Sequence, residues 1–351
     1  MKTKQNKGKT FGVCVAALAF LLMAAGSGTN SGDTASKIGE VSSKSAEESS
    51  NNDESSSSKE ESSKDDSSSS KASDDSSSKS DAPEKKSEYH VGDIIQTDDL
   101  KIVYTASGDY HTDNEFLQPD AGKKYIFIEL YCENISKSDT SIPSFSFECY
   151  ADGYSCDGAY LSENELSATL SPGRSTSGRV YFTVPENSSE IQIEYEVNVW
   201  TEEKAIFAFD GNADSGFVPE NNTEATADAF KVGDIITTQN LIITYLSSGE
   251  YTSDNMFMTP KDGYHYIYCE FEFENISDSD EHVSSYDFDC FADGSSCDGF
   301  FGMDDNLSAT LSPKRKAKGT VAFEVPINAE NVEVEFLTNY WTSDRIVFTY
   351  K

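Results

Sequence analysis

The chain contains an internal repeat with an offset of 141 positions, the distance from Asp93 to Asp234 (234 − 93). Three motifs recur at this offset without any gap: VGDII at residues 91–95 and 232–236, NIS at residues 134–136 and 275–277, and LSATLSP at residues 166–172 and 307–313. Self-similarity at one fixed offset indicates a duplicated structural unit. We therefore expect two copies of one domain, at residues 89–210 and 230–351, separated by a linker at residues 211–229.

Each copy contains segments in which inward apolar residues alternate with residues of the opposite parity. The inward sets are Ile126, Ile128, Leu130 and Cys132 in the first copy, and Ile267, Cys269, Phe271 and Phe273 in the second. A period of two is typical of a strand with one buried face. About seven such short strands per copy, separated by Gly, Pro, Asn and Asp clusters, predict an all-β immunoglobulin-like β-sandwich, with a small barrel as the alternative.

The N-terminus has the order of a secretory signal peptide, which we place at residues 1–26. Four lysines within the first nine residues precede an apolar run at residues 11–25. A run of about 15 residues is shorter than the roughly 20 that span a bilayer, so an uncleaved membrane anchor is the alternative. The run ends in a sequence similar to a bacterial lipoprotein box, but Ser27 follows where lipid attachment requires a cysteine thiol. Lipid anchoring at this position is therefore not expected.

Residues 27–88 consist almost entirely of Ser, Asp, Glu, Lys, Asn and Ala. Such a segment cannot bury enough apolar surface to fold, and we expect a disordered acidic stalk. The whole chain carries 62 acidic and 27 basic side chains, a formal net charge of −35. This charge disfavours nucleic acid and anionic membrane surfaces as partners. The expected partner is an extracytoplasmic protein or an envelope glycan, with membrane contact only through an uncleaved signal segment.

The order of several short motifs resembles one bacterial family. The motifs are VGD at residues 91–93, the strand at residues 125–133 followed by NIS, Asp152-Gly153, LSPG at residues 170–173 and FTVP at residues 182–185. This order resembles the bacterial domain of unknown function 4352 over the full length of each copy. The resemblance implies a telokin-like immunoglobulin sandwich found in exported Gram-positive lipoproteins and secreted antigens, and it implies no activity. Lys314 replaces the glycine found at Gly173, which affects one turn.

Four cysteines form two equivalent pairs. A two-residue turn at Asp152-Gly153 places Cys149 opposite Cys156, and the same geometry pairs Cys290 with Cys297. In an oxidising exterior we expect both disulfides to form. Zinc is a poor alternative, because the spacing is wrong and no histidine lies near the cysteines in both copies. Cys132 and Cys269 fall on the inward parity of their strands, which predicts buried free thiols; a bridge between the copies is the alternative.

The sequence offers little for catalysis. None of the four histidines has a histidine at the equivalent position of the other copy, and no nucleophile elbow or zinc-protease helix is present. We therefore expect a protein that is not an enzyme, without catalytic residues, cofactor or dedicated metal site. The acidic pairs Asp287 with Asp289 and Asp304 with Asp305 leave weak calcium binding as an alternative.

A row of aromatic residues occupies the parity opposite the inward set. These residues are Tyr125, Phe127, Tyr131, Tyr266 and Tyr268. Clustered exposed aromatics mark binding surfaces, so this row is a possible ligand face, with ordinary cross-strand packing as the alternative. Together the patterns predict an exported, non-catalytic binding or structural module of the cell surface or secretome. A secreted carbohydrate-binding or calcium-binding protein is the alternative function.

Overall fold

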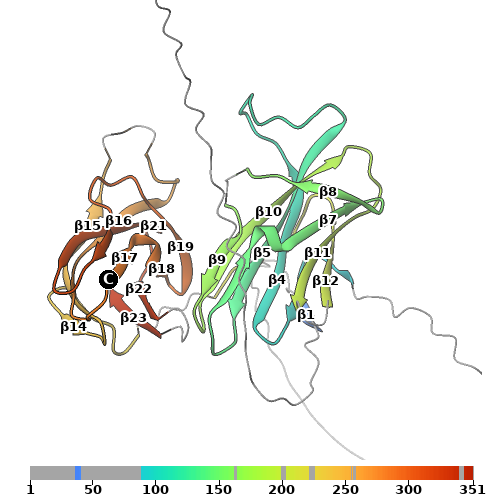
Figure 1. Cartoon of the computed structure of the whole chain (residues 1–351). Helices are drawn as coiled ribbons and strands as arrows, with labels where there is room; N and C mark the ends of the chain where they lie inside the picture. The colour runs from blue at the N-terminus through green and yellow to red at the C-terminus, as the bar shows by residue number, and fades with distance from the viewer. Residues whose placement is uncertain are drawn as a thin grey trace, which may run out of the picture. The chain divides into compact units, whose positions relative to one another are not determined.

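The computed structural model of the chain describes residues 36–40, 88–161, 164–198, 203–220, 226–253, 255, 258–339 and 344–350. The expected signal peptide and most of the expected stalk lie outside the described residues. Within the described ranges, all regular elements are strands except two short 3-10 helices (Figure 1). No helix in this part of the chain is long and apolar enough to cross a membrane.

Domain 1 is built from two sheets. Its strands are β2 (Glu88–Tyr89), β3 (Asp93–Gln96), β4 (Leu100–Tyr110), β5 (Lys123–Asn134), β6 (Thr140–Pro143), β7 (Phe147–Ala151), β8 (Tyr154–Gly158), β9 (Ser167–Leu170), β10 (Ser175–Pro185), β11 (Ile191–Asn198), β12 (Glu203–Ala208) and β13 (Ala213–Asp214). One sheet has the order β3-β4-β5-β10 and the other the order β12-β11-β7-β8. Strand β8 also pairs with β10, which joins the sheets along one edge. The pair β6-β9 forms a separate ladder.

Domain 2 repeats this arrangement. Its strands are β14 (Ile235–Thr237), β15 (Leu241–Tyr251), β16 (Tyr264–Asn275), β17 (Glu281–Ser284), β18 (Phe288–Ala292), β19 (Ser295–Gly299), β20 (Ser308–Leu311), β21 (Lys316–Pro326), β22 (Val332–Asn339) and β23 (Asp344–Thr349). The sheets have the orders β14-β15-β16-β21 and β23-β22-β18-β19, and β17 pairs with β20. The predicted duplication of an all-β sandwich is thus confirmed.

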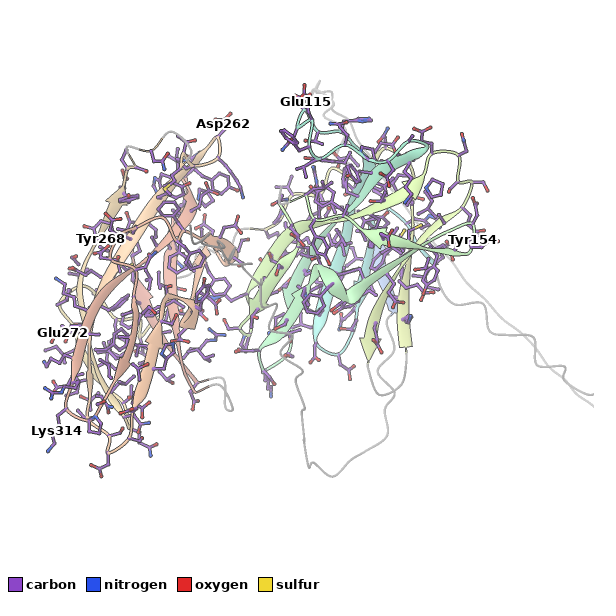
Figure 2. All side chains as sticks on the ribbon, turned by 45° about the horizontal axis from the view of Figure 1, so that its top comes forward. Glu115, Tyr154, Asp262, Tyr268, Glu272 and Lys314 are labelled. Carbon is purple, nitrogen blue, oxygen red and sulfur yellow. The ribbon has the colours of Figure 1, made fainter. Side chains whose placement is uncertain are left out.

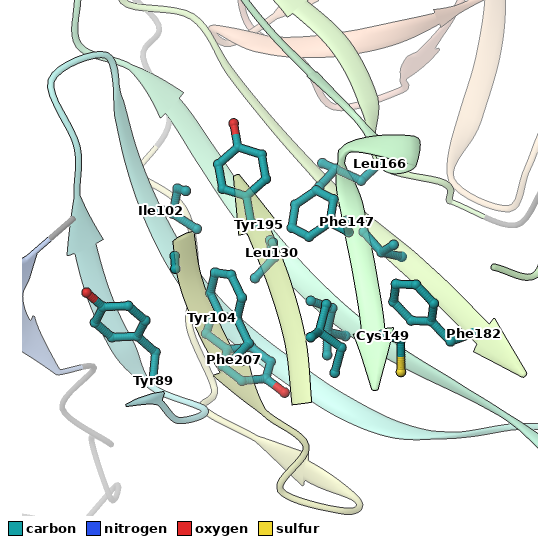
Figure 3. Close-up of a cluster of buried hydrophobic side chains, with 14 of the residues drawn as sticks. Tyr89, Ile102, Tyr104, Leu130, Phe147, Cys149, Leu166, Phe182, Tyr195 and Phe207 are labelled. Carbon is teal, nitrogen blue, oxygen red and sulfur yellow. The ribbon is translucent and has the colours of Figure 1, made fainter. Parts of the chain in front are cut away.

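Each domain has its own hydrophobic core between its two sheets, and Figure 3 shows the core of domain 1. The predicted inward residues of β5 and β16 are fully buried. This includes Cys132 and Cys269, which are buried free thiols as predicted. In domain 1, Tyr104 and Phe207 meet edge to face, with ring centroids 5.4 Å apart. The alternation in the sequence therefore identifies the buried face of these strands correctly.

The asparagine of the NIS motif stabilises the fold of each copy through hydrogen bonds to backbone carbonyl groups. The buried Asn134 side chain donates hydrogen bonds from Nδ2 to the carbonyl oxygens of Ser138 and Leu170, each at 2.7 Å. In domain 2 the Asn275 side chain makes the equivalent pair of bonds, to Ser279 and Leu311. These bonds link the loop after β5 or β16 to the end of β9 or β20, and they give the buried amide group of each Asn the partners that a buried polar group requires.

Two segments differ from the sequence-based expectation of unstructured chain. Residues Ser36–Glu40 of the expected stalk form strand β1, which pairs antiparallel with β3. The open edge of β3 offers unpaired backbone groups that such a segment can satisfy. In the expected linker, β13 pairs with β4, and Ser215 donates its backbone N–H to the Thr105 carbonyl oxygen. Domain 1 therefore extends beyond residue 210.

Candidate functional site

Phe127 and Tyr268, two members of the expected ligand face, pack over glycines. Phe127 lies opposite Gly108 in the β4–β5 ladder, and its ring is 2.8 Å from the point where a Gly108 Cβ would be. Tyr268 has the same relation to Gly249, at 3.0 Å. The Arg179 guanidinium covers the Phe127 ring, 4.3 Å from its centroid. Both rings thus fill space left by a missing side chain, which is a packing role.

For Tyr131 and Tyr266 the expectation of exposure is wrong. Tyr131 is 6% exposed and lies against Phe217, with ring centroids 5.1 Å apart. Tyr266 is 8% exposed and stacks with Phe300 at 3.9 Å. In both cases a residue from outside the strand covers the outward face, which the parity of the strand does not reveal. In domain 2, Glu272 takes the position of Tyr131 and lies on β16 with Tyr268 (Figure 2).

Tyr125 lies between these two groups, neither packed over a glycine nor covered like Tyr131 and Tyr266. It is half-buried and lies opposite Tyr110 in the β4–β5 ladder and Thr183 in the β5–β10 ladder. The five residues therefore do not form one continuous exposed surface. A ligand-binding role for this face stays a prediction.

A different set of aromatic residues is strongly exposed, and its positions correspond between the domains. Phe145 and Tyr160 are 79% and 77% exposed in domain 1, and Tyr286 and Phe301 are 80% and 49% exposed in domain 2. The repeat offset of 141 relates Phe145 to Tyr286 (286 − 145) and Tyr160 to Phe301 (301 − 160). We call these the aromatic pairs of domain 1 and domain 2. None of these four residues belongs to the ligand face predicted from the sequence.

A short 3-10 helix turns Phe145 outward. Phe145 and Phe147 have the same strand parity, and a continuous strand would bury both. Instead, η1 (Ser144–Ser146) precedes β7, and only Phe147 points into the core. In domain 2, η2 (Ser285–Asp287) does the same for Tyr286. Here the Ser284 hydroxyl accepts from the Tyr286 backbone N–H, and Asp287 accepts from the Ser284 N–H. The outward rings thus depend on a local turn conserved between the domains.

In domain 1 the aromatic pair borders a cavity of about 140 Å³. Buried Phe147, Val180 and Phe182 form part of its lining, with Phe145 and Tyr160 exposed beside them. Glu165 also lines the cavity, and its Oε1 accepts a hydrogen bond from the Ser144 hydroxyl. Nothing lies within 4 Å of the point where a Gly158 Cβ would be, so the backbone there is open.

Domain 2 differs at the equivalent positions, because the Phe300 ring stacks on Tyr266 at the outer face of β16 and the Phe301 ring lies over Gly299. Phe300 replaces Ala159, and the Phe301 ring lies 3.0 Å from the point where a Gly299 Cβ would be. Phe301 also stacks with Tyr286, with centroids 4.9 Å apart. Asn306 replaces Glu165 and donates from Nδ2 to the Phe301 carbonyl oxygen at 2.7 Å. The two domains therefore share the aromatic pair but differ in shape and charge beside it.

The cysteine pairs face each other as the turn geometry predicts. Cys149 lies opposite Cys156 and Cys290 opposite Cys297 in their hairpin ladders. All four are free thiols in this structure. Burial, with the neighbouring thiol, raises the pKa of Cys149 and of Cys290 well above the ordinary value. The register is thus confirmed, while the disulfide bonds stay a prediction.

The acidic pairs considered for calcium have other partners. Asp287 caps η2, Asp289 accepts from the Arg345 guanidinium at 2.8 Å, and Asp305 accepts from the Thr320 hydroxyl at 2.7 Å. Desolvation raises the pKa of Asp287 and of Asp289 above the ordinary value. In the described part of the chain, no group of three or more His, Cys, Asp or Glu residues is placed to hold a metal ion.

The two-sheet cores of the two domains define a tandem immunoglobulin-like β-sandwich protein. The chain belongs to the family described as "Domain of unknown function (DUF4352)", whose model matches residues 89–206 and 230–346, more than half of the sequence. Each matched region lies within one structural domain and covers most of it.

Several solved structures are similar at low identity. A putative lipoprotein (ycdA) from Bacillus subtilis is 11% identical over 33% of this chain and 38% of its own, with a TM-score of 0.30. The yjhA protein from Bacillus subtilis is 16% identical over 35% and 99%, with a TM-score of 0.29. The secreted protein MPT63 from Mycobacterium tuberculosis is 12% identical over 35% and 99%, with a TM-score of 0.28. This chain thus spans well under half of the length of ycdA. No curated protein matches the chain.

Proposed function

We propose that this protein is an exported, non-catalytic binding module whose two domains present their aromatic pairs to a partner outside the cytoplasmic membrane, either a protein or an envelope glycan. The observation that carries the proposal is the strong exposure of aromatic rings at equivalent positions of both domains. Exposed aromatic residues that the fold does not need are typical of contact surfaces, because aromatic side chains contribute large contact area at low entropic cost.

The other shared motifs support this reading because they have structural duties. Asn134 and Asn275 bond loop carbonyls, and Asp152 and Asp293 accept backbone N–H bonds from the facing loop. The interiors are filled by apolar side chains. No shared histidine is available for acid–base chemistry. Export is supported by the order of charged and apolar residues at residues 1–26.

The test is co-sedimentation with native cell-envelope fragments. We compare the unchanged chain with a variant in which Phe145, Tyr160, Tyr286 and Phe301 are all replaced by serine. Each lost anchor contributes about 1–2 kcal/mol in a typical interface, so we expect binding to fall by at least about tenfold. Circular dichroism and thermal unfolding establish that the variant still folds.

The matched control is Tyr154→Ser. Tyr154 is 79% exposed at the tip of the β7–β8 hairpin (Figure 2), and Ser295 stands at its position in domain 2. We expect this control to bind as the unchanged chain does. Equal binding by all three proteins would show that the aromatic pairs are not the contact surface.

A further inference from the structure

We propose that the cavity beside the aromatic pair of domain 1 binds the ammonium end of a lysine side chain from a protein partner. This inference rests on the proposed function and names the chemistry recognised at one of its two surfaces. It concerns domain 1 alone. The cavity is lined by Phe145, Tyr160 and Glu165, together with buried apolar side chains.

The composition of the cavity favours a cation with an alkyl stem. Aromatic rings attract a cation electrostatically, and a neighbouring carboxylate adds a charge-assisted hydrogen bond. Phe145 and Tyr160 provide the rings, and half-buried Glu165 provides the carboxylate. The Ser144 hydroxyl orients the carboxylate by donating to Oε1. A lysine side chain matches this arrangement, because its methylene stem packs on apolar surface while its ammonium group reaches a polar partner.

Arg179 forms an isolated backbone β-bridge with Glu165, but its side chain does not pair with the Glu165 carboxylate. The Arg179 Nε is 2.6 Å from Glu129 Oε2, and its guanidinium lies over the Phe127 ring. Its positive charge is therefore directed to the outer face of the sheet. The Glu165 carboxylate keeps its role as the acidic group of the cavity.

Size and overall charge also favour a basic side chain. The cavity of about 140 Å³ is smaller than the roughly 300 Å³ at which most small-molecule sites begin, so it suits the end of one side chain. The net charge of −35 attracts basic partners over long distances. Domain 2 lacks these features, since the Phe301 ring lies over Gly299 and stacks on Tyr286, and Asn306 replaces the acid.

The experiment titrates the full isotope-labelled chain with a capped Gly-Lys-Gly tripeptide and follows backbone amide signals by NMR. We expect saturable shifts at Gly158 and Glu165 with the lysine peptide at millimolar concentration. An otherwise identical norleucine peptide, which keeps the alkyl chain without the charge, should bind at least about tenfold more weakly. The amide of Gly299 in domain 2 should not shift.

Two variants test the residues separately. Glu165→Gln keeps the size and the acceptor for Ser144 but removes the charge, and should weaken lysine-peptide binding by about tenfold. Ala159→Phe places a large ring at a residue that lines the cavity and should reduce the shifts at Gly158. The amide spectrum of each variant reports whether the chain is folded. If Ala159→Phe does not fold, Glu165→Gln alone decides the outcome.

Equal binding of the lysine and norleucine peptides, or no effect of Glu165→Gln, would overturn the inference. Shifts at Gly158 with N-acetylglucosamine disaccharide but not with the lysine peptide would also overturn it, and would identify the cavity as a sugar site. In each of these cases the envelope assay still decides the proposed function independently, because that assay depends on the aromatic rings of both domains and not on Glu165.

Discussion

Tyr286 stacks on Phe301 in domain 2, with ring centroids 4.9 Å apart and ring planes inclined by 28°. The equivalent residues of domain 1, Phe145 and Tyr160, instead border an open cavity. The same two positions therefore also stabilise the surface of domain 2, while in domain 1 they border the cavity.

Replacing Phe301 by alanine should destabilise the chain by about 0.5–1.5 kcal/mol, because an aromatic pair contributes about this much beyond its buried area. The matched change Tyr160→Ala in domain 1 should alter the free energy of unfolding by less than about 0.5 kcal/mol, as for an ordinary surface substitution. Urea unfolding of the full chain measures both. Equal losses would mean that the ring stack of domain 2 adds nothing to stability.

Replacing Lys314 by glycine should stabilise domain 2 by about 1 kcal/mol. Lys314 has a φ of 66°, in the left-handed region that is unfavourable for residues with a Cβ. Gly173 holds the equivalent position of domain 1 with a φ of 78° and open space around it. The reverse change, Gly173→Lys, should therefore destabilise domain 1 by a similar amount. A rise in thermal midpoint for both variants would contradict this account.

The exported protein should contain two disulfides, Cys149–Cys156 and Cys290–Cys297, since each pair is directly opposed in its hairpin. Intact-mass measurement of material purified under oxidising conditions should show the loss of four hydrogens. Reduction should lower the free energy of unfolding by about 2 kcal/mol per bond, because each closed loop is short. Replacing Cys156 by serine should halve the mass difference. An unchanged mass in oxidised material would exclude both bonds.

The pKa of His90 should lie above 6.5. Its Nδ1 is 2.9 Å from Asp210 Oδ1, and this hydrogen bond and the charge of Asp210, with smaller effects of Glu88 and Asp93, raise the pKa. The folded chain thus binds the proton more tightly than the unfolded chain, whose histidine has a pKa of about 6.5. The resulting stabilisation is fully present below pH 6.5 and is lost as the pH rises through the folded pKa. NMR titration of the imidazole checks the value, and Asp210→Asn should lower it.

Replacing Tyr131 by serine should destabilise domain 1 by about 2–4 kcal/mol, because the buried ring packs against Phe217. Replacing the half-buried Tyr125 by serine should have a much smaller effect on stability. Thermal unfolding distinguishes the two. If Tyr125→Ser alone also reduced envelope binding, the outer sheet face would contribute to the contact surface after all.

The sequence predicted those parts of the fold that depend on neighbouring residues. Alternation located the buried face of β5 through Ile126 and Ile128, and the Asp152-Gly153 turn fixed the register that opposes Cys149 to Cys156. Both are local consequences of strand geometry.

The exposed surface was harder to predict because it depends on distant residues and on breaks in periodicity. Tyr131 has outward parity but is covered by Phe217, which lies far along the chain. Phe145 has inward parity but is turned outward by η1. One feature of the sequence could have pointed to the aromatic pairs: aromatic residues recur at the repeat offset within turn-rich segments. Exposure at those positions required knowledge of the three-dimensional structure.

The replacement of Glu165 by Asn306, with Phe301 lying over Gly299, gives this protein an internal reference. A ligand that binds the first sandwich meets, in the same molecule and at the same concentration, a second sandwich of nearly the same framework that lacks the acidic cavity. A signal that changes in one half and not in the other therefore reports on the cavity itself, free of differences in expression, export or handling between separate samples.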